Sequence, residues 1–209
     1  MFNKQVYILR RSVLKSKLGS GVLLFLGNEE SPMNYKDNTY HFRQDSTFLY
    51  YFGISEPSLA AIIDLDEDNE IIFGDEMSID DIVWMGRQKT LKEKSEDAGL
   101  TKILPSSQLA IYLKKYQQQN RNVQFLPPYR AENLIKLATW FNVYVAQVKN
   151  SASIPFIKAV VAQRSVKSME EISELDKAAA ISADIHLIVI KYAKQGMYER
   201  EIVAKIQEA

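Results

Sequence analysis

Short apolar runs bounded by turn residues mark the strands expected in the first part of this chain. Residues 22–26 are uninterrupted apolar residues between glycines, a pattern typical of a buried strand. Residues 59–65 and 70–73 are two further apolar stretches, and the acidic tip between them predicts a hairpin. Residues 48–52 are rich in aromatic side chains, which favours another strand, ended by Gly53.

Helical periodicity alternates with these strands. Residues 4–18 carry apolar side chains at helical spacing, and further helices are expected after the serines at 106–107 and over residues 131–140. Residues 123–125 predict a short strand, and the Pro- and Asn-containing stretch 29–38 predicts a loop. This alternation predicts an α/β fold with a mixed sheet and flanking helices.

The last part of the chain predicts two helices. Ser168 and Glu171 have the spacing of a capping box, and Gly196 is expected to close the helix that starts there. Apolar or small residues recur along that helix at Ile172, Leu175, Ala179, Ser182, Val189 and Ala193. A second helix is expected from Glu199 and is still amphipathic at Ala209. We therefore expect the chain to be part of a longer protein.

Composition and charge exclude several classes of protein. Lys plus Arg and Asp plus Glu each number 26, so the net charge is zero and nucleic acid is not an expected partner. The basic residues Arg10, Arg11, Lys15 and Lys17 are expected on the exposed side of the first helix. With no cysteine, no signal-like segment and no apolar stretch of about 18 residues, we expect no membrane span and a soluble, cytoplasmic protein.

The acidic stretch 64–70 resembles the start of a calcium-binding loop. Such a loop needs glycine at its sixth position and glutamate at its twelfth, between two helices, but Asn69 and Asp75 stand there. A solvated hairpin tip is the favoured alternative to calcium binding. The histidines are His41 and His186, and His186 is expected at a packed or interfacial helix position. No metal-ligand, serine-hydrolase or phosphate-loop motif appears in the sequence.

Four segments resemble one known family. Residues 42–57, FRQDSTFLYYFGISEP, are similar to the signature of aminopeptidase P N-terminal domains. Residues 82–87, IVWMGR, resemble a second element of that family, and residues 164–172, RSVKSMEEI, resemble the segment that opens its catalytic domain. Residues 196–199, GMYE, resemble the start of a following helix, although Tyr198 replaces the usual Ser or Thr and weakens the cap by about 1 kcal/mol.

The resemblance implies a domain organisation and an activity. It implies a creatinase-like aminopeptidase P N-terminal domain at residues 1–160, and a linker with the opening helices of a truncated pita-bread catalytic domain at 161–209. In that family of Xaa-Pro aminopeptidases two metal ions, usually manganese, are held by two Asp, one His and two Glu. All five ligands are expected beyond this sequence, so no catalytic or metal-binding residue is assigned here and the chain alone is expected to be inactive.

The resemblance also implies a role for the N-terminal domain. In that family this domain leans over the active site of a neighbouring subunit, restricts substrate length and supports a homo-oligomer acting on proline-containing peptides. Trp84 is the expected substrate-binding residue, and a half-buried structural tryptophan is the alternative. The aromatic face of residues 48–52 is assigned to packing, and Arg43 with Asp45 to a structural ion pair at a strand entry.

Two other functions share this fold in the family. Prolidase, an Xaa-Pro dipeptidase, is one alternative that this sequence leaves open. The other is a catalytically dead protein-interaction module of the kind found in histone chaperone complexes. The balanced charge argues against histone or DNA partners.

Overall fold

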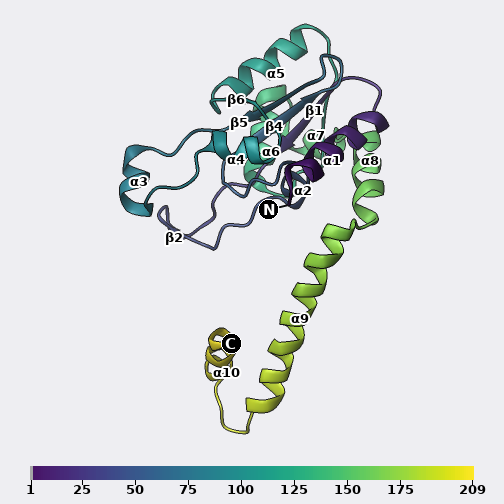
Figure 1. Ribbon diagram of the computed structural model, residues 1–209. Coiled ribbons are helices and arrows are strands. Elements are labelled where there is room, and N and C mark those ends of the chain that lie inside the picture. Colours follow the sequence, from purple (N-terminus) through teal and green to yellow (C-terminus); the bar gives the residue numbers. More distant parts are fainter. Residues whose placement is uncertain (1) are drawn as a thin grey trace. The chain divides into compact units, whose positions relative to one another are not determined.

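The computed structural model describes residues 2–209 (Figure 1). The chain divides into two compact units, residues 1–163 and residues 164–209.

The first unit is built on a five-stranded mixed sheet. Its strands are β1 (Val22–Leu26), β4 (Ala60–Asp64), β5 (Asn69–Phe73), β6 (Lys102–Leu104) and β7 (Val123–Phe125), in the order β6-β5-β4-β1-β7. β4 runs antiparallel to β1 and β5, whereas β7 is parallel to β1 and β6 is parallel to β5. The predicted strand at 22–26 and the predicted hairpin of β4 and β5 are confirmed.

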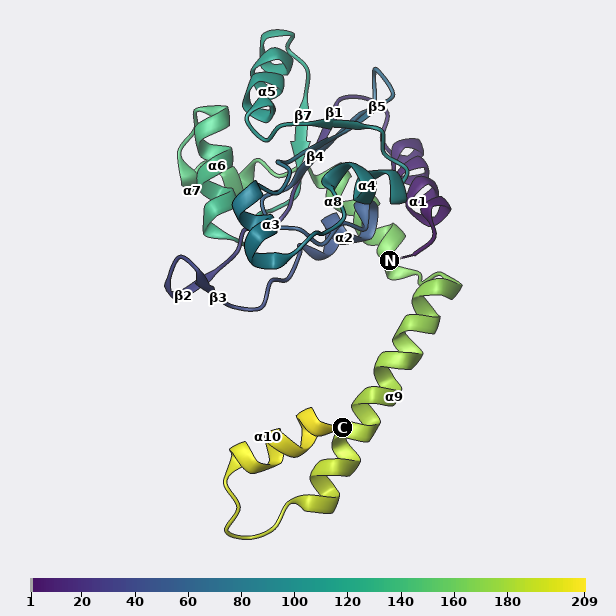
Figure 2. The same cartoon turned by 60° about the vertical axis from the view of Figure 1, so that its left-hand side comes forward.

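Helices cover both faces of this sheet (Figure 2). Side chains of Leu23 and Phe25 enter one buried cluster, and those of Val22 and Leu24 enter the other, because successive residues of a strand point to opposite faces. The first cluster packs against α1 (Lys4–Lys17), α2 (Ser46–Phe52), α4 (Leu91–Asp97) and α8 (Ile154–Ser165). The second packs against α5 (Gln108–Gln118), α6 (Ala131–Phe141) and α7 (Val145–Asn150). The predicted α/β class is confirmed.

The strand predicted at residues 48–52 is wrong, because this segment lies in helix α2. The carboxylate of Asp45 accepts the backbone N–H groups of Thr47 and Phe48, both at 2.8 Å, and thereby caps the first turn. Gly53 ends the helix in the left-handed region with φ of +67°. Asp45 is thus a helix cap and not half of an ion pair with Arg43 at a strand entry.

The expectation that Arg10 and Arg11 are exposed is also wrong. The Arg11 side chain is 1% exposed and donates to the carboxylate of Glu70 at 2.7 Å and to the carbonyl of Tyr51 at 2.9 Å. Arg10 is buried with its guanidinium 3.9 Å from the ring centroid of Tyr50. Both arginines are tolerated inside because acceptors or an aromatic face meet their guanidinium groups.

Several elements lie where the sequence predicted none. The stretch predicted as a loop contains a small hairpin of β2 (Pro32–Tyr35) and β3 (Asn38–Thr39). The segment after β5 contains helix α3 (Ile79–Met85). Strand β6 was missed because its three residues are all only partly buried, so no fully buried apolar run indicates it.

The second unit consists of α9 (Met169–Tyr192) and α10 (Glu199–Glu208). The predicted capping box is present, since the Ser168 N–H donates to the Glu171 carboxylate and the Glu171 N–H donates to the Ser168 hydroxyl. The first helix is capped by Ala193, so Gly196 does not close it as predicted. His186 is exposed, so it is not packed within this unit, and the interfacial position that was the other expectation for it stays a prediction. None of the helices described within residues 2–209 combines the length and apolarity that crossing a bilayer requires.

Candidate functional site

Helix α3 exposes an unusual amount of apolar surface. The exposed fraction is 86% for Trp84, 80% for Ile79 and 75% for Val83, and no residue of this helix is buried. Trp84 therefore does not pack against its own domain. Its side chain is exposed, and not half-buried as the structural alternative predicts. Contiguous exposed apolar side chains are typical of a binding surface. We refer to Ile79, Ile82, Val83, Trp84 and Met85 as the α3 patch.

A capping box begins this short helix and a glycine ends it. The Ser78 hydroxyl accepts the N–H of Asp81 at 3.1 Å, and the Asp81 carboxylate accepts the N–H of Ser78 at 2.9 Å. The hydrogen bonds from Ser78 lower the pKa of Asp81, which keeps the carboxylate charged at the helix N-terminus. Gly86 ends the helix with φ of +72°. The cap residues hold α3 as a helix although nothing is buried beneath it.

Of the α3 patch, Trp84 alone is predicted from the sequence as a binding residue, and its neighbours are not. The signal was present, because Ile82, Val83, Trp84 and Met85 are four consecutive apolar residues. A helix packed on one side has its apolar residues three and four positions apart, with polar residues between them. A short run of consecutive apolar residues lacks this spacing, so it indicates either a buried strand or a helix with exposed apolar side chains. The capping box formed by Ser78 and Asp81 favours the helix.

The signature segment contributes structure. The side chain of Gln44 is buried and its Oε1 accepts the N–H groups of Asn28 and Asp45, while its Nε2 donates to the Glu56 carbonyl at 2.7 Å. The aromatic residues of α2 lie in the first cluster, where Phe52 packs edge-on against Phe25. The packing role predicted for this aromatic segment is confirmed, on a helix and not on a strand.

The acidic stretch forms a hairpin turn whose carboxylates are bound by arginine. The Arg121 guanidinium donates to Asp64 at 2.8 Å through Nη1 and to Asp66 at 2.6 Å through Nη2. Lys15 binds Asp68 at 2.8 Å. The predicted hairpin is confirmed. The carboxylates that a calcium ion would need form ion pairs with Arg121 and Lys15 instead.

The metal ions that the resemblance implies do not fit residues 2–209. No three His, Asp or Glu side chains in that range lie together in an arrangement able to hold a metal ion. The His41 and His186 imidazoles belong to different units, and the acidic side chains of the β4–β5 turn are bound to Arg121 and Lys15. We therefore derive no chemical step from these residues.

Residues 7–125 match the family described as Aminopeptidase P, N-terminal domain. The chain belongs to this family. The matched range contains the complete five-stranded sheet, the Gln44 side chain and the α3 patch.

Known relatives and solved structures agree with this membership. A probable Xaa-Pro aminopeptidase of Aspergillus fumigatus is 26% identical over 162 residues, which is 77% of this chain and 33% of that protein. The Xaa-Pro dipeptidase of Rattus norvegicus is 26% identical over 194 residues, which is 90% of this chain and 38% of that protein. A low-pH form of aminopeptidase P from E. coli has the same fold, with a TM-score of 0.79 at 22% identity over 100% of this chain and 49% of that one. The chain thus spans half or less of the length of these proteins.

Proposed function

We propose that residues 1–160 are the non-catalytic N-terminal domain of an Xaa-Pro aminopeptidase. The complete protein would remove an N-terminal residue that precedes proline, using metal-activated water. Its two metal ions, manganese by analogy with the family, would be held by residues outside this chain. We assign the second unit, α9 and α10, to the opening helices of that catalytic domain. The chain by itself is then inactive towards Xaa-Pro peptides, with or without added manganese.

The α3 patch is the observation that carries the proposed role of this domain. An isolated domain gains nothing by holding Trp84 and Val83 in water, because burying apolar side chains is favourable by about 1.5–3 kcal/mol each. We infer that the α3 patch is covered in a homo-oligomer, where it leans over the active site of a neighbouring subunit. There the α3 patch limits the length of the peptide substrate, and the Trp84 side chain contacts the substrate residues that follow proline.

The test is the Trp84→Ala variant of the complete protein. Loss of an aromatic contact of this kind costs on the order of 2 kcal/mol, so kcat/KM on tripeptides and longer Xaa-Pro peptides should fall about thirty-fold. The unfolding midpoint should stay close to that of the unchanged protein, because the side chain is 86% exposed. Tyr144→Ala is the matched control, since Tyr144 is 82% exposed on another part of the domain. Equal kinetics for both variants would contradict the proposal for Trp84.

A dipeptidase is the second candidate, because the relatives include Xaa-Pro dipeptidases from rat and human. The two activities separate by substrate length. An aminopeptidase cleaves Xaa-Pro tripeptides and longer peptides, whereas a dipeptidase cleaves Xaa-Pro dipeptides alone. Rates of the complete protein on a dipeptide and on the same dipeptide extended by one residue decide between them.

A further inference from the structure

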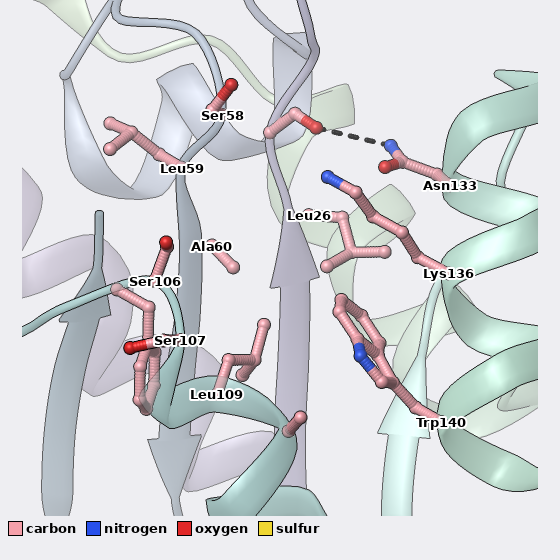
Figure 3. A pocket seen from close by; sticks show the side chains of 13 residues that line it. Leu26, Ser58, Leu59, Ala60, Ser106, Ser107, Leu109, Asn133, Lys136 and Trp140 are labelled. Atoms are coloured by element: carbon pink, nitrogen blue, oxygen red, sulfur yellow. Dashed lines mark hydrogen bonds between the residues drawn. The ribbon is translucent and has the colours of Figure 1, made fainter. Parts of the chain in front are cut away.

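A hollow of about 280 Å³ lies at the carboxyl edge of the sheet (Figure 3), and no residue of the α3 patch lines it. Its floor is formed by Leu26 at the end of β1, Ala60 at the start of β4 and Phe73 at the end of β5. The start of α5 and one side of α6 form its walls. Small ligands of open α/β sheets bind outside the carboxyl ends of the strands, so this is the place where such a fold offers a site.

The wall from α6 presents an acceptor that lacks a donor. Asn133, Lys136 and Trp140 follow one another at helical spacing and line the hollow (Figure 3). Asn133 is 6% exposed, and its Nδ2 donates to the Gly27 carbonyl at 3.2 Å. This bond fixes the orientation of the amide, since the opposite orientation would set oxygen against oxygen. The Asn133 Oδ1 is then buried without a hydrogen-bond partner in residues 2–209, which is a costly arrangement for a carbonyl oxygen.

Two hydroxyl groups of the hollow also present acceptors. The Ser58 hydroxyl donates to the carboxylate of Glu29, and the Ser106 hydroxyl donates to the carboxylate of Asp75. Because each hydroxyl hydrogen is already used, the two oxygens can accept but not donate. The ammonium group of Lys136 is paired with Glu29. The unpartnered Asn133 oxygen and these two hydroxyl oxygens favour a ligand that brings N–H donors.

We propose that this hollow binds a small apolar group that carries an N–H donor, either a primary amide or an ammonium. The apolar body lies over Leu109 and against the Trp140 indole, and its N–H donates to the Asn133 Oδ1. Figure 3 shows the Lys136 side chain beside that oxygen. Rotation of this flexible side chain, which keeps its exposed end in water, opens the path for the ligand.

Three probes of one size test this assignment on the 209-residue chain by ¹H–¹⁵N NMR. Benzamide offers a neutral N–H donor, benzylamine offers a cationic one, and benzoate offers acceptors only. Benzamide should shift the side-chain resonances of Asn133 and Trp140 and saturate with a Kd on the order of 1 mM. Benzoate should leave both resonances in place. Benzylamine binding beside benzamide identifies the donor as either an amide or an ammonium, whereas binding of benzamide alone restricts it to a neutral amide.

A pair of neighbouring variants locates the bound probe. Ala110 lies exposed at the edge of the hollow on α5, so Ala110→Phe should fill the space and abolish the benzamide shifts. Ile111→Phe changes the next residue, which is 59% exposed and does not line the hollow, and should leave them unchanged. Absence of benzamide shifts in the unchanged chain overturns the assignment, and so does equal binding of benzoate. Undiminished benzamide binding by a folded Ala110→Phe variant overturns it as well.

Discussion

Gln44 Oε1 accepts the backbone N–H of Asn28 at 2.8 Å, across sixteen positions of the chain. The same oxygen accepts the N–H of Asp45, and the Nε2 donates to the carbonyl groups of Glu56 and Ile54. One buried side chain therefore joins the end of β1 to the segments that enter and leave α2. A glutamine suits this position because its amide both donates and accepts.

Replacing Gln44 by alanine should destabilise the first unit strongly. The change leaves four backbone groups without these partners, two of them buried and two partly buried, and a single buried group costs about 1–3 kcal/mol. We expect the free energy of unfolding in urea to fall by at least about 3 kcal/mol. Gln118→Ala, at an exposed position of α5, serves as the control and should change it by less than about 0.5 kcal/mol. Equal effects of both changes would show that the Gln44 contacts carry little stability.

Replacing Arg11 by methionine should be costly although methionine is apolar. Arg11 binds Glu70 and also donates to the carbonyl groups of Tyr51 and Ala98. Removing one partner of a buried pair costs about 3–5 kcal/mol. The lower end of that range applies here, because the Tyr51 and Ala98 carbonyls lose their donor while Glu70 keeps its ion pair with Lys15 at 3.0 Å. Lys17→Met, on the exposed end of the same helix, should be nearly neutral. A shift of the thermal midpoint that is no larger for Arg11→Met than for Lys17→Met would contradict this prediction.

Gly53→Ala should combine backbone strain with a steric clash. Gly53 has φ of +67°, and a Cβ at this position would lie 2.4 Å from the Tyr7 ring. The left-handed conformation costs an alanine about 1–2 kcal/mol, and the clash adds about 1–3 kcal/mol. Gly86→Ala, where φ is +72° and an added Cβ meets nothing within 4 Å, measures the conformational cost without the clash. The prediction fails if the two variants have the same free energy of unfolding.

Stability should fall in acid partly through Asp64. Burial would raise the pKa of Asp64, but hydrogen bonds from Arg121 and from the Glu67 N–H outweigh it and hold the pKa below its usual range. As the pH falls, Asp64 is therefore protonated in the unfolded chain before it is protonated in the folded chain. The contribution of Asp64 to the free energy of unfolding is complete above a pH of about 4, and it is lost as the pH falls through the lower pKa of the folded state. Asp64→Asn should flatten the dependence of unfolding free energy on pH below about 4.

Asp37→Asn, on the exposed β2–β3 turn, is the control for the pH measurement and should keep the slope of the unchanged chain. Urea titrations at several pH values between neutral and strongly acidic conditions give the slopes directly. An Asp64→Asn variant whose slope equals that of the control would remove Asp64 from the explanation of acid sensitivity.

The central strands could be predicted because a strand that is buried on both faces has an uninterrupted run of apolar residues. Val22 to Leu26 are apolar without interruption, as expected for a strand covered by helices on both sides. Residues 48–52 misled because aromatic side chains have high β propensity, whereas tertiary packing and the cap from Asp45 decide for a helix. The burial of Arg11 had no local signal, since its partners Glu70 and Ala98 lie far along the chain.

The two candidate sites, Trp84 and the hollow beside Asn133, also differ in how far the sequence predicts them. Trp84 stood out within a segment that resembles a family element, and its exposure agrees with a binding role without testing it. The hollow beside Asn133 could not be predicted, because it requires the ends of three strands and two helices to meet. An asparagine in the first turn of a helix is an ordinary cap-region residue in sequence. Its unpartnered oxygen becomes visible only in three dimensions.

The pairing of β1 with β7 determines when this domain can fold. Val22 of β1 pairs with Val123 of β7, so one side of β1 lacks its partner strand until about 100 further residues have been synthesised. At a synthesis rate of about 5–20 residues per second, β1 and the β4–β5 hairpin stay exposed for seconds before the sheet is complete. During that interval the apolar edge of β1 is open to other chains. The β1–β7 contact is therefore one that cannot form until residue 125 has been synthesised.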